Sequence, residues 1–308
     1  MTDAIERFEI AVPEAELSDL HRRLAGTRWP DRQVVDDWSQ GIPLDVVVDL
    51  VRHWRENYDW RQTERRLNRI PQFRTVIDDV PIHFVHVRSP HPDATPVVLT
   101  HGWPGSFLEF EQVLPGLADP PDGNAAFHVV VPSLPGYAFS GRPTTAGWNI
   151  HRIAAAWCEL TTRLGYRRFL AAGSDWGTSI STCIALDQPD RLLGLHLVPP
   201  LVPPDRATAD HTAAERQALT ELDERSRNGS GYSAMHGTRP QTLGYGLTDS
   251  PAGLAAWIGE KLWTWTERDA GGLTIDQMLD NISLYWLTGT ATSSTRLYWE
   301  SIAEVSTW

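Results

Sequence analysis

The sequence predicts an α/β protein in which a mostly parallel sheet is covered by helices, with further helical segments on either side. Between residues 82 and 198, short apolar runs alternate with stretches of helical periodicity, a pattern typical of parallel strands joined by helices. The flanking residues repeat their apolar positions at helical spacing instead. We therefore expect a helical N-terminal segment over residues 1–75, a core over 76–200 and a helical lid over 201–308.

The N-terminal segment is expected to contain helices and connecting loops. Its first helix starts at Pro13, a residue that suits a first helical position, and ends at Gly26. Its second helix follows Pro43, because apolar residues recur there at helical spacing. The apolar positions of the two helices are Leu17, Leu20 and Leu24, then Val47, Leu50, Val51 and Trp54.

The core begins with a strand at residues 82–87, where polar and apolar residues alternate. Four later runs are apolar throughout, which is typical of strands buried on both faces of a sheet. These runs cover residues 96–100, 127–131, 168–172 and 192–198. An apolar stripe from Ile153 to Leu164 predicts a helix between two of them. Prolines between residues 199 and 204 then end the regular structure, and helical sequence follows.

Composition excludes several classes of function. A net charge of −12 argues against nucleic acid and anionic membrane as partners. The two cysteines cannot form a disulfide framework, and the N-terminus lacks the features of a signal peptide, so a cytoplasmic protein is expected. Fourteen tryptophans suit a well-filled core and a pocket for an apolar ligand equally well. The oligomeric state stays open, a homo-oligomer included.

The central motif is Ala172-Gly173-Ser174-Asp175-Trp176-Gly177, which follows a strand and precedes a helix. This Gly-x-nucleophile-x-Gly spacing predicts a nucleophile elbow with Asp175 as the nucleophile. The glycines are required because the turn is sharp and the strand packs closely on the helix. Two alternatives are that Asp175 only caps the helix and that Ser174 is the nucleophile.

A second motif, Thr100-His101-Gly102-Trp103-Pro104-Gly105-Ser106, also follows a strand. An elbow of this kind needs a second backbone N–H from a loop in this position to complete an oxyanion hole. The backbone N–H groups of Trp103 and Trp176 are the candidates. The alternative is a simple Gly/Pro turn.

These motifs resemble the epoxide hydrolase family of the microsomal type, and the resemblance runs through nearly the whole chain. It rests on segments 27–31, 58–61, 67–73, 101–106, 132–137, 174–177, 238–242, 249–257 and 285–290. The resemblance implies an α/β-hydrolase core, an Asp nucleophile, and hydrolysis of a small apolar epoxide to a vicinal diol. It also implies two lid tyrosines as proton donors, which fall on Tyr232 and Tyr298.

The expected substrate pocket is formed by Trp103, Pro104, Phe107 and Trp176. No metal or organic cofactor is expected, because no side-chain cluster has metal-ligand spacing. An aspartate suits the chemistry because its product with an epoxide is an ester, which water can hydrolyse, whereas serine would form an ether. A tyrosine, with a pKa near 10, remains a proton donor at neutral pH.

The chain departs from the family pattern at its end. The resemblance implies a histidine that activates water and an acid that orients it, both after the lid, but the last histidine is His236 and the chain ends at Trp308. The last two strands of the fold are also expected to be missing, which leaves residues 192–198 as an unpaired apolar edge. We therefore expect a longer natural protein, and a chain that stops after the first chemical step.

Two other functions remain open at this point. A haloalkane dehalogenase resembles this family in its Asp-Trp elbow, and tryptophan N–H donors such as those of Trp103 and Trp176 suit a halide. The tyrosine pair favours the epoxide instead. The alternative from another class is a non-catalytic binder that keeps the pocket.

Overall fold

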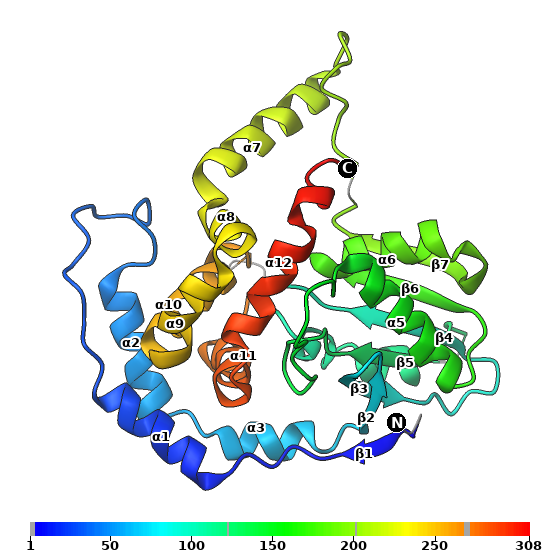
Figure 1. Cartoon of the computed structure of the whole chain (residues 1–308), viewed down its shortest axis with the longest axis horizontal. Coiled ribbons are helices and arrows are strands. Elements are labelled where there is room, and N and C mark those ends of the chain that lie inside the picture. Colours follow the sequence, from blue (N-terminus) through cyan, green and yellow to red (C-terminus); the bar gives the residue numbers. More distant parts are fainter. Residues whose placement is uncertain (1–3, 122, 201, 268–271) are drawn as a thin grey trace.

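A seven-stranded sheet and a separate group of C-terminal helices make up the computed structural model, which describes residues 4–121, 123–200, 202–267 and 272–308 (Figure 1). The strands are β1 (Glu6–Phe8), β2 (Gln72–Ile77), β3 (Val80–Val87), β4 (Thr95–Thr100), β5 (Phe127–Pro132), β6 (Phe169–Ser174) and β7 (Leu192–Val198). The first helices are α1 (Glu14–Ala25), α2 (Leu44–Glu56), α3 (Trp60–Leu67), η1 (Phe107–Phe110), α4 (Leu114–Ala118), α5 (Ile150–Arg163), α6 (Trp176–Asp187) and η2 (Pro189–Arg191). The later helices are α7 (Ala213–Gly229), α8 (Gly231–Thr238), α9 (Pro240–Asp249), α10 (Pro251–Thr264), α11 (Ile275–Thr288) and α12 (Ala291–Val305).

The sheet has the strand order β1-β2-β3-β5-β4-β6-β7. The pairings from β5 through β4 and β6 to β7 are parallel, whereas those from β1 through β2 and β3 to β5 are antiparallel. The five strands expected from the sequence are confirmed, but the sheet is mixed and not mostly parallel. β7 forms one edge, where Leu193 and Leu195 are exposed.

Two strands were missed by the sequence analysis, which expected only helices and loops before residue 76. β1 has three residues, too few for a periodic pattern. In β2, the polar Gln72 and Thr75 are buried while Phe73 and Val76 are half-buried, so the usual link between polarity and burial is inverted. Gln72 is tolerated inside because it donates to the Leu67 carbonyl and bonds to His83.

Strand residues alternate between two apolar clusters, one on each face of the sheet. Phe84, Val98 and Val130 belong to the cluster that includes residues of α5 and α6, and α6 packs directly on β4, β6 and β7. Val97 and Val129 belong to the second cluster, which includes residues of η1 and α4. This burial on both faces explains why the central strands are apolar throughout.

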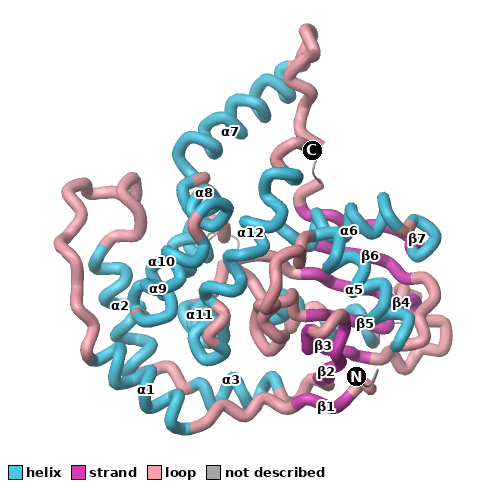
Figure 2. The backbone as a smooth tube through the Cα atoms, in the orientation of Figure 1, coloured by secondary structure: helices cyan, strands magenta, loops and turns pink. Residues whose placement is uncertain are grey.

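The C-terminal helices lie beside the strands (Figure 1). The N-terminal helices lie to the left of and below the C-terminal helices in the same view (Figure 2). α1 and α2 contact α10, and α3 contacts α11. A buried carboxylate joins α3 to α11: Asp280 accepts from Tyr58 Oη at 2.7 Å, Thr63 Oγ1 at 2.5 Å and Arg66 Nη2 at 2.7 Å. Among the described residues, no helix is both long and apolar enough to cross a membrane.

α12 is bonded to the core along most of its length. Its partners lie in the segment between β5 and α5 and in the first turn of α5. The bonds run from Tyr137 Oη to the Ser294 carbonyl, from Ser293 Oγ to the Gly136 carbonyl, from Gly147 N to Glu300, from Ile150 N to Ser301 Oγ, and between His151 and Glu304. This helix therefore has a fixed place above the sheet.

Candidate active site

Asp175 occupies the sharp turn between β6 and α6. Its backbone has φ 52° and ψ −119°, a left-handed φ that is strained for a residue with a side chain. A Cβ added at Gly173 would lie 2.0 Å from the Gly177 carbonyl oxygen, and one at Gly177 would lie 1.9 Å from the Thr100 carbonyl oxygen. Both glycines are thus required by close backbone packing. The Asp175 side chain makes no N-cap hydrogen bond, which would go to the second or third residue of α6, so the capping alternative is wrong.

Backbone donors hold the Asp175 carboxylate. Trp103 N donates to Asp175 Oδ1 at 2.8 Å, and the Trp176 backbone N–H also interacts with the carboxylate. Desolvation raises the pKa of Asp175, while these two donors and the positive charge of Arg225 counteract that rise. Gly102 makes the approach possible, because a Cβ there would lie 2.2 Å from Asp175 Oδ1. Part of the residue is nevertheless exposed to solvent, so a ligand can reach it.

Tyr232 on α8 and Tyr298 on α12 come from the C-terminal helices, and both interact electrostatically with this carboxylate. Their ring centroids are 5.9 Å apart, and the two side chains interact with each other. Desolvation, followed by the negative charge of Asp175, raises the pKa of both phenols, so both remain protonated at neutral pH. The structure thus brings two neutral O–H donors from separate helices to the nucleophile that the sequence predicts.

The four residues expected to line the pocket lie in different places. The Trp103 ring stacks on Tyr232 with centroids 5.2 Å apart, and the Trp176 ring meets Tyr298 edge-on at 4.8 Å. Pro104, which follows Trp103 in the chain, is buried, and its carbonyl oxygen accepts from Asn281 Nδ2 at 2.7 Å. The Phe107 ring instead packs on His83 and Phe139 in the second apolar cluster, away from the tyrosine pair.

The two histidines near the site, His101 and His236, form hydrogen bonds within the protein. His236 is buried against Trp103 and Tyr298, and its Nε2 accepts from Trp257 Nε1 at 3.0 Å. Desolvation lowers the pKa of His236 to about 3 and that of His101 to about 4. His101 Nε2 accepts from Leu134 N, and its Nδ1 lies 3.0 Å from the Gly102 carbonyl. Both nitrogens of His101 are therefore bonded, whereas His236 Nδ1 is buried without a hydrogen-bond partner among the described residues.

Glu109 is a site residue that sequence reasoning missed. It lies in η1, and Ser174 Oγ donates to Glu109 Oε2 at 3.0 Å. A Cβ added at Gly105 would lie 1.3 Å from Glu109 Oε1, so this glycine leaves the space that the carboxyl group fills. Desolvation, and to a lesser extent the charge of Asp175, raises the pKa of Glu109. The glycine four residues earlier was the only sequence signal, and it is a weak one.

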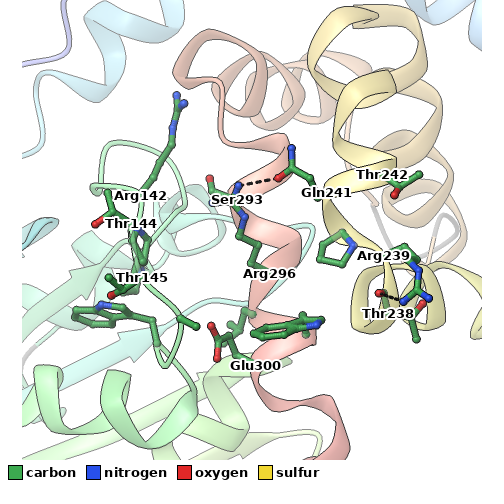
Figure 3. Close-up of a pocket in the computed structure, with 17 residues that line it drawn as sticks. Arg142, Thr144, Thr145, Thr238, Arg239, Gln241, Thr242, Ser293, Arg296 and Glu300 are labelled. Carbon is green, nitrogen blue, oxygen red and sulfur yellow. Dashed lines mark hydrogen bonds between the residues drawn. The ribbon is translucent and has the colours of Figure 1, made fainter.

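A separate cavity of about 760 Å³ lies on another side of α12 (Figure 3). Its lining includes Arg142 from the core, Gln241 from α9, and Arg296 and Glu300 from α12. In Figure 3, Arg296 reaches from α12 to Gln241, to which it donates at 3.1 Å. Asp175 is not part of this lining, so the chemistry predicted from the sequence does not belong to this cavity.

Comparison with protein families gives two matches that together span most of the chain. Residues 5–110 match the family described as epoxide hydrolase N terminus, and residues 95–265 match the alpha/beta hydrolase fold. A protein of Stigmatella aurantiaca (strain DW4/3-1) that bears the name of an epoxide hydrolase is 52% identical over 305 residues, or 96% of this chain and 69% of that protein. Epoxide hydrolase 1 of Sus scrofa is 34% identical over 334 residues, or 98% of this chain and 74% of that protein.

Solved structures lead to the same group of proteins. The structure of Aspergillus niger epoxide hydrolase is 31% identical in sequence and similar in fold, with a TM-score of 0.88. The match covers 96% of this chain and 78% of that one. The similarity therefore includes the N-terminal helices and the C-terminal helices as well as the sheet.

Proposed function

Because this chain belongs to the epoxide hydrolase family, we propose that it opens a small apolar epoxide to a vicinal diol through an ester on Asp175. The observation that carries the proposal is the position of Asp175 at the strained elbow, with one oxygen held by the Trp103 N–H. The other oxygen is free to attack an epoxide carbon. Attack there breaks the C–O bond of the ring, and the oxygen that leaves takes a proton from Tyr232 or Tyr298.

The proposal accounts for the arrangement of donors around the carboxylate. After attack through Oδ2, Oδ1 becomes the carbonyl oxygen of the ester and already accepts from Trp103 N, with the Trp176 N–H also close to the carboxylate. Those donors then stabilise the oxyanion that forms when water adds to the ester. A haloalkane dehalogenase would share this ester chemistry, but a halide leaves without a proton. Two neutral tyrosines beside the nucleophile therefore favour the epoxide.

The direct test is covalent capture. The protein is mixed with styrene oxide, quenched in acid at short times, and digested for peptide mapping by mass spectrometry. We expect the mass of one epoxide on the peptide that contains Asp175, since the ester forms before it is hydrolysed. Modification elsewhere, or diol formation with no ester on Asp175 at any time, would contradict the proposal.

The two tyrosines should each contribute to the first chemical step. Tyr232→Phe and Tyr298→Phe should slow ester formation by roughly 100-fold each, as expected when one donor to a developing oxyanion is lost. The measurement is the rate of ester formation in a single turnover. Tyr245→Phe is a matched control, because this tyrosine of α9 is 72% exposed and should leave the rate unchanged. Unchanged rates in the first two variants would make them packing residues.

A further inference from the structure

We infer that Lys261 of α10 is a positioning residue for the opening of the epoxide: its ammonium group holds the ring of Tyr232 and stabilises the negative charge that this phenol acquires as it gives up its proton. The inference rests on the proposed function, because it concerns a proton donor in the same reaction. Three observations support it: the burial of Lys261, the contacts of its ammonium group, and the path of the negative charge when the ester forms.

Lys261 is an exception in both the sequence and the fold. The sequence contains 27 lysine and arginine residues, and Lys261 is the only lysine among them. Its side chain is only 9% exposed. Burial of an ammonium group is costly because the group loses its hydration, and an apolar side chain in such a place is often equally stabilising. The stability of α10 therefore does not account for a lysine at this position, and its charge needs another explanation.

The ammonium group of Lys261 lies beside two aromatic rings of the site. Its Nζ is 4.9 Å from the centre of the Tyr232 ring and 5.8 Å from the centre of the Trp265 ring. Both distances are within the range in which a cation is attracted to the face of an aromatic ring. Nζ also donates to Glu260 Oε1 at 2.9 Å, which restricts the ammonium group further. Lys261 thus contacts Tyr232 through its ring, and this contact does not occupy the phenol oxygen.

Neighbouring rings hold Tyr232 in place beside this cation. Trp103 stacks on it with an interplanar angle of 13°, while Trp265 and His236 meet it edge-on at centroid distances of 5.3 Å and 5.6 Å. Desolvation, followed by the positive charge of Lys261, lowers the pKa of His236 to about 3. His236 is therefore neutral at neutral pH, and Lys261 is a fixed positive charge beside a fixed phenol.

Negative charge moves toward Tyr232 as the ester forms. Before the attack, the charge lies on the Asp175 carboxylate. Attack by Oδ2 produces a neutral ester and breaks the C–O bond of the epoxide, so the charge passes to the epoxide oxygen. When that oxygen takes the proton of Tyr232, the charge lies on the phenolate, which later recovers a proton from water. A cation beside Tyr232 therefore stabilises the charge more as the bond breaks than before, and this difference lowers the barrier.

The two phenols differ in how readily they carry this charge. Desolvation raises the pKa of both, but their interaction with each other opposes the rise in Tyr232 and adds to it in Tyr298. Negative charge is therefore accommodated better on Tyr232 than on Tyr298. Lys261 acts in the same direction, because its Nζ lies over the Tyr232 ring.

The experiment compares ester formation in Lys261→Met and in the unmodified protein. Each protein is mixed with styrene oxide over a range of concentrations and quenched in acid, and the Asp175 peptide is quantified by mass spectrometry. We expect the maximum rate of ester formation to fall roughly 10-fold, as for the loss of a buried cation from an aromatic face, while the half-saturating concentration stays within about threefold. Urea denaturation should show no loss of stability, because the replacement of a buried charge by an apolar side chain is tolerated.

Glu260→Gln is the matched control for the ion pair. It keeps the cation and an oxygen that can accept from Nζ, but it removes the negative charge of the partner. This variant should form the ester at the unmodified rate. A role of Lys261 limited to the ion pair would slow both variants alike, and would contradict the inference.

Two double variants show whether the effect depends on the phenol. Lys261→Met should cause no further slowing in a Tyr232→Phe protein, because the phenol that carries the charge is absent there. In a Tyr298→Phe protein it should cause the same loss of roughly 10-fold. A purely structural lysine would slow both backgrounds equally.

Because Lys261 is the only lysine, its charge can also be changed in the protein after it has folded. Acetylation removes the charge and reductive methylation keeps it, and both are verified by peptide mass. The acetylated protein should form the ester roughly 10-fold more slowly than the methylated one. The same treatments of Tyr232→Phe control for the α-amino group, which also reacts. This comparison decides the question even if Lys261→Met does not fold.

The outcomes separate this inference from the proposed function. An unchanged rate of ester formation in Lys261→Met, or equal rates in the acetylated and methylated proteins, would overturn the role of Lys261 and leave the proposed function intact. Absence of any ester on Asp175 in the unmodified protein would overturn the proposed function, and the inference with it.

Discussion

Asp175→Asn should lose ester formation almost completely, with a rate roughly 10⁴-fold or more below that of the unmodified protein. An amide is a poor nucleophile, and no other side chain occupies the centre of the elbow. The replacement is close to isosteric and keeps an oxygen that can accept from Trp103 N, so the turn should retain its shape. The measurement is the rate of adduct formation with styrene oxide, followed by peptide mapping.

Deamidation is the main source of error in that measurement, because it would restore the aspartate. The variant is therefore used freshly prepared, with the residue at this position verified by peptide mass before and after the reaction. Asp190→Asn, in η2 at the surface, serves as a matched control for the substitution itself. A verified Asp175→Asn protein that captures epoxide at the normal rate would show that the nucleophile lies elsewhere.

Asp280→Ala should destabilise the fold by about 3 kcal/mol, because it leaves three buried or half-buried donors without their acceptor. The carboxylate is 7% exposed and binds Tyr58, Thr63 and Arg66 at once. Arg66 also pairs with Glu111 and is 43% exposed, so the loss should fall at the lower end of the range for a broken buried pair. The free energy of unfolding is measured by urea denaturation.

The control for this prediction is an ion pair at the surface. Asp45 pairs with Arg32, and both side chains are more than half exposed. Asp45→Ala should therefore change the free energy of unfolding by less than about 1 kcal/mol. Similar values for the two aspartate variants would mean that the Asp280 network does not join α3 to α11 in the way its hydrogen bonds indicate.

The parts of the fold that the sequence predicted correctly are those whose burial follows polarity. β5 is apolar where it is buried, and α1, α2 and α5 each carry an apolar stripe at helical spacing. β7 is an exception, because it is apolar but most of its residues are exposed or half-buried. β2 could not be found in this way, because Gln72 and Thr75 are polar residues at buried positions and depend on hydrogen bonds to residues outside the strand, which for Thr75 is Arg163. Pairing over long sequence distances cannot be read from local periodicity.

The residues of the candidate site also differ in how far the sequence alone could identify them. Asp175, Trp103 and Trp176 belong to local motifs whose shape is determined by neighbouring glycines, so spacing was enough to identify them. Tyr232 and Tyr298 came from the family resemblance alone, since a lone tyrosine on a helix is usually a packing residue. Glu109 needed the structure, because only the folded loop brings its carboxyl group over Gly105 and beside Ser174.

The attachment of α12 to the core has a consequence for how a substrate would meet Tyr298, the proposed proton donor. Tyr298 lies in the middle of a helix that is bonded to the core both before and after it. The phenol is therefore already in place before a substrate binds. Its conformational entropy is lost when the protein folds, and not again each time a substrate binds. In a site organised in advance, selectivity depends on fit. We expect different epoxides to be distinguished by the rigid space around Asp175, and not by how well each one induces a lid to close.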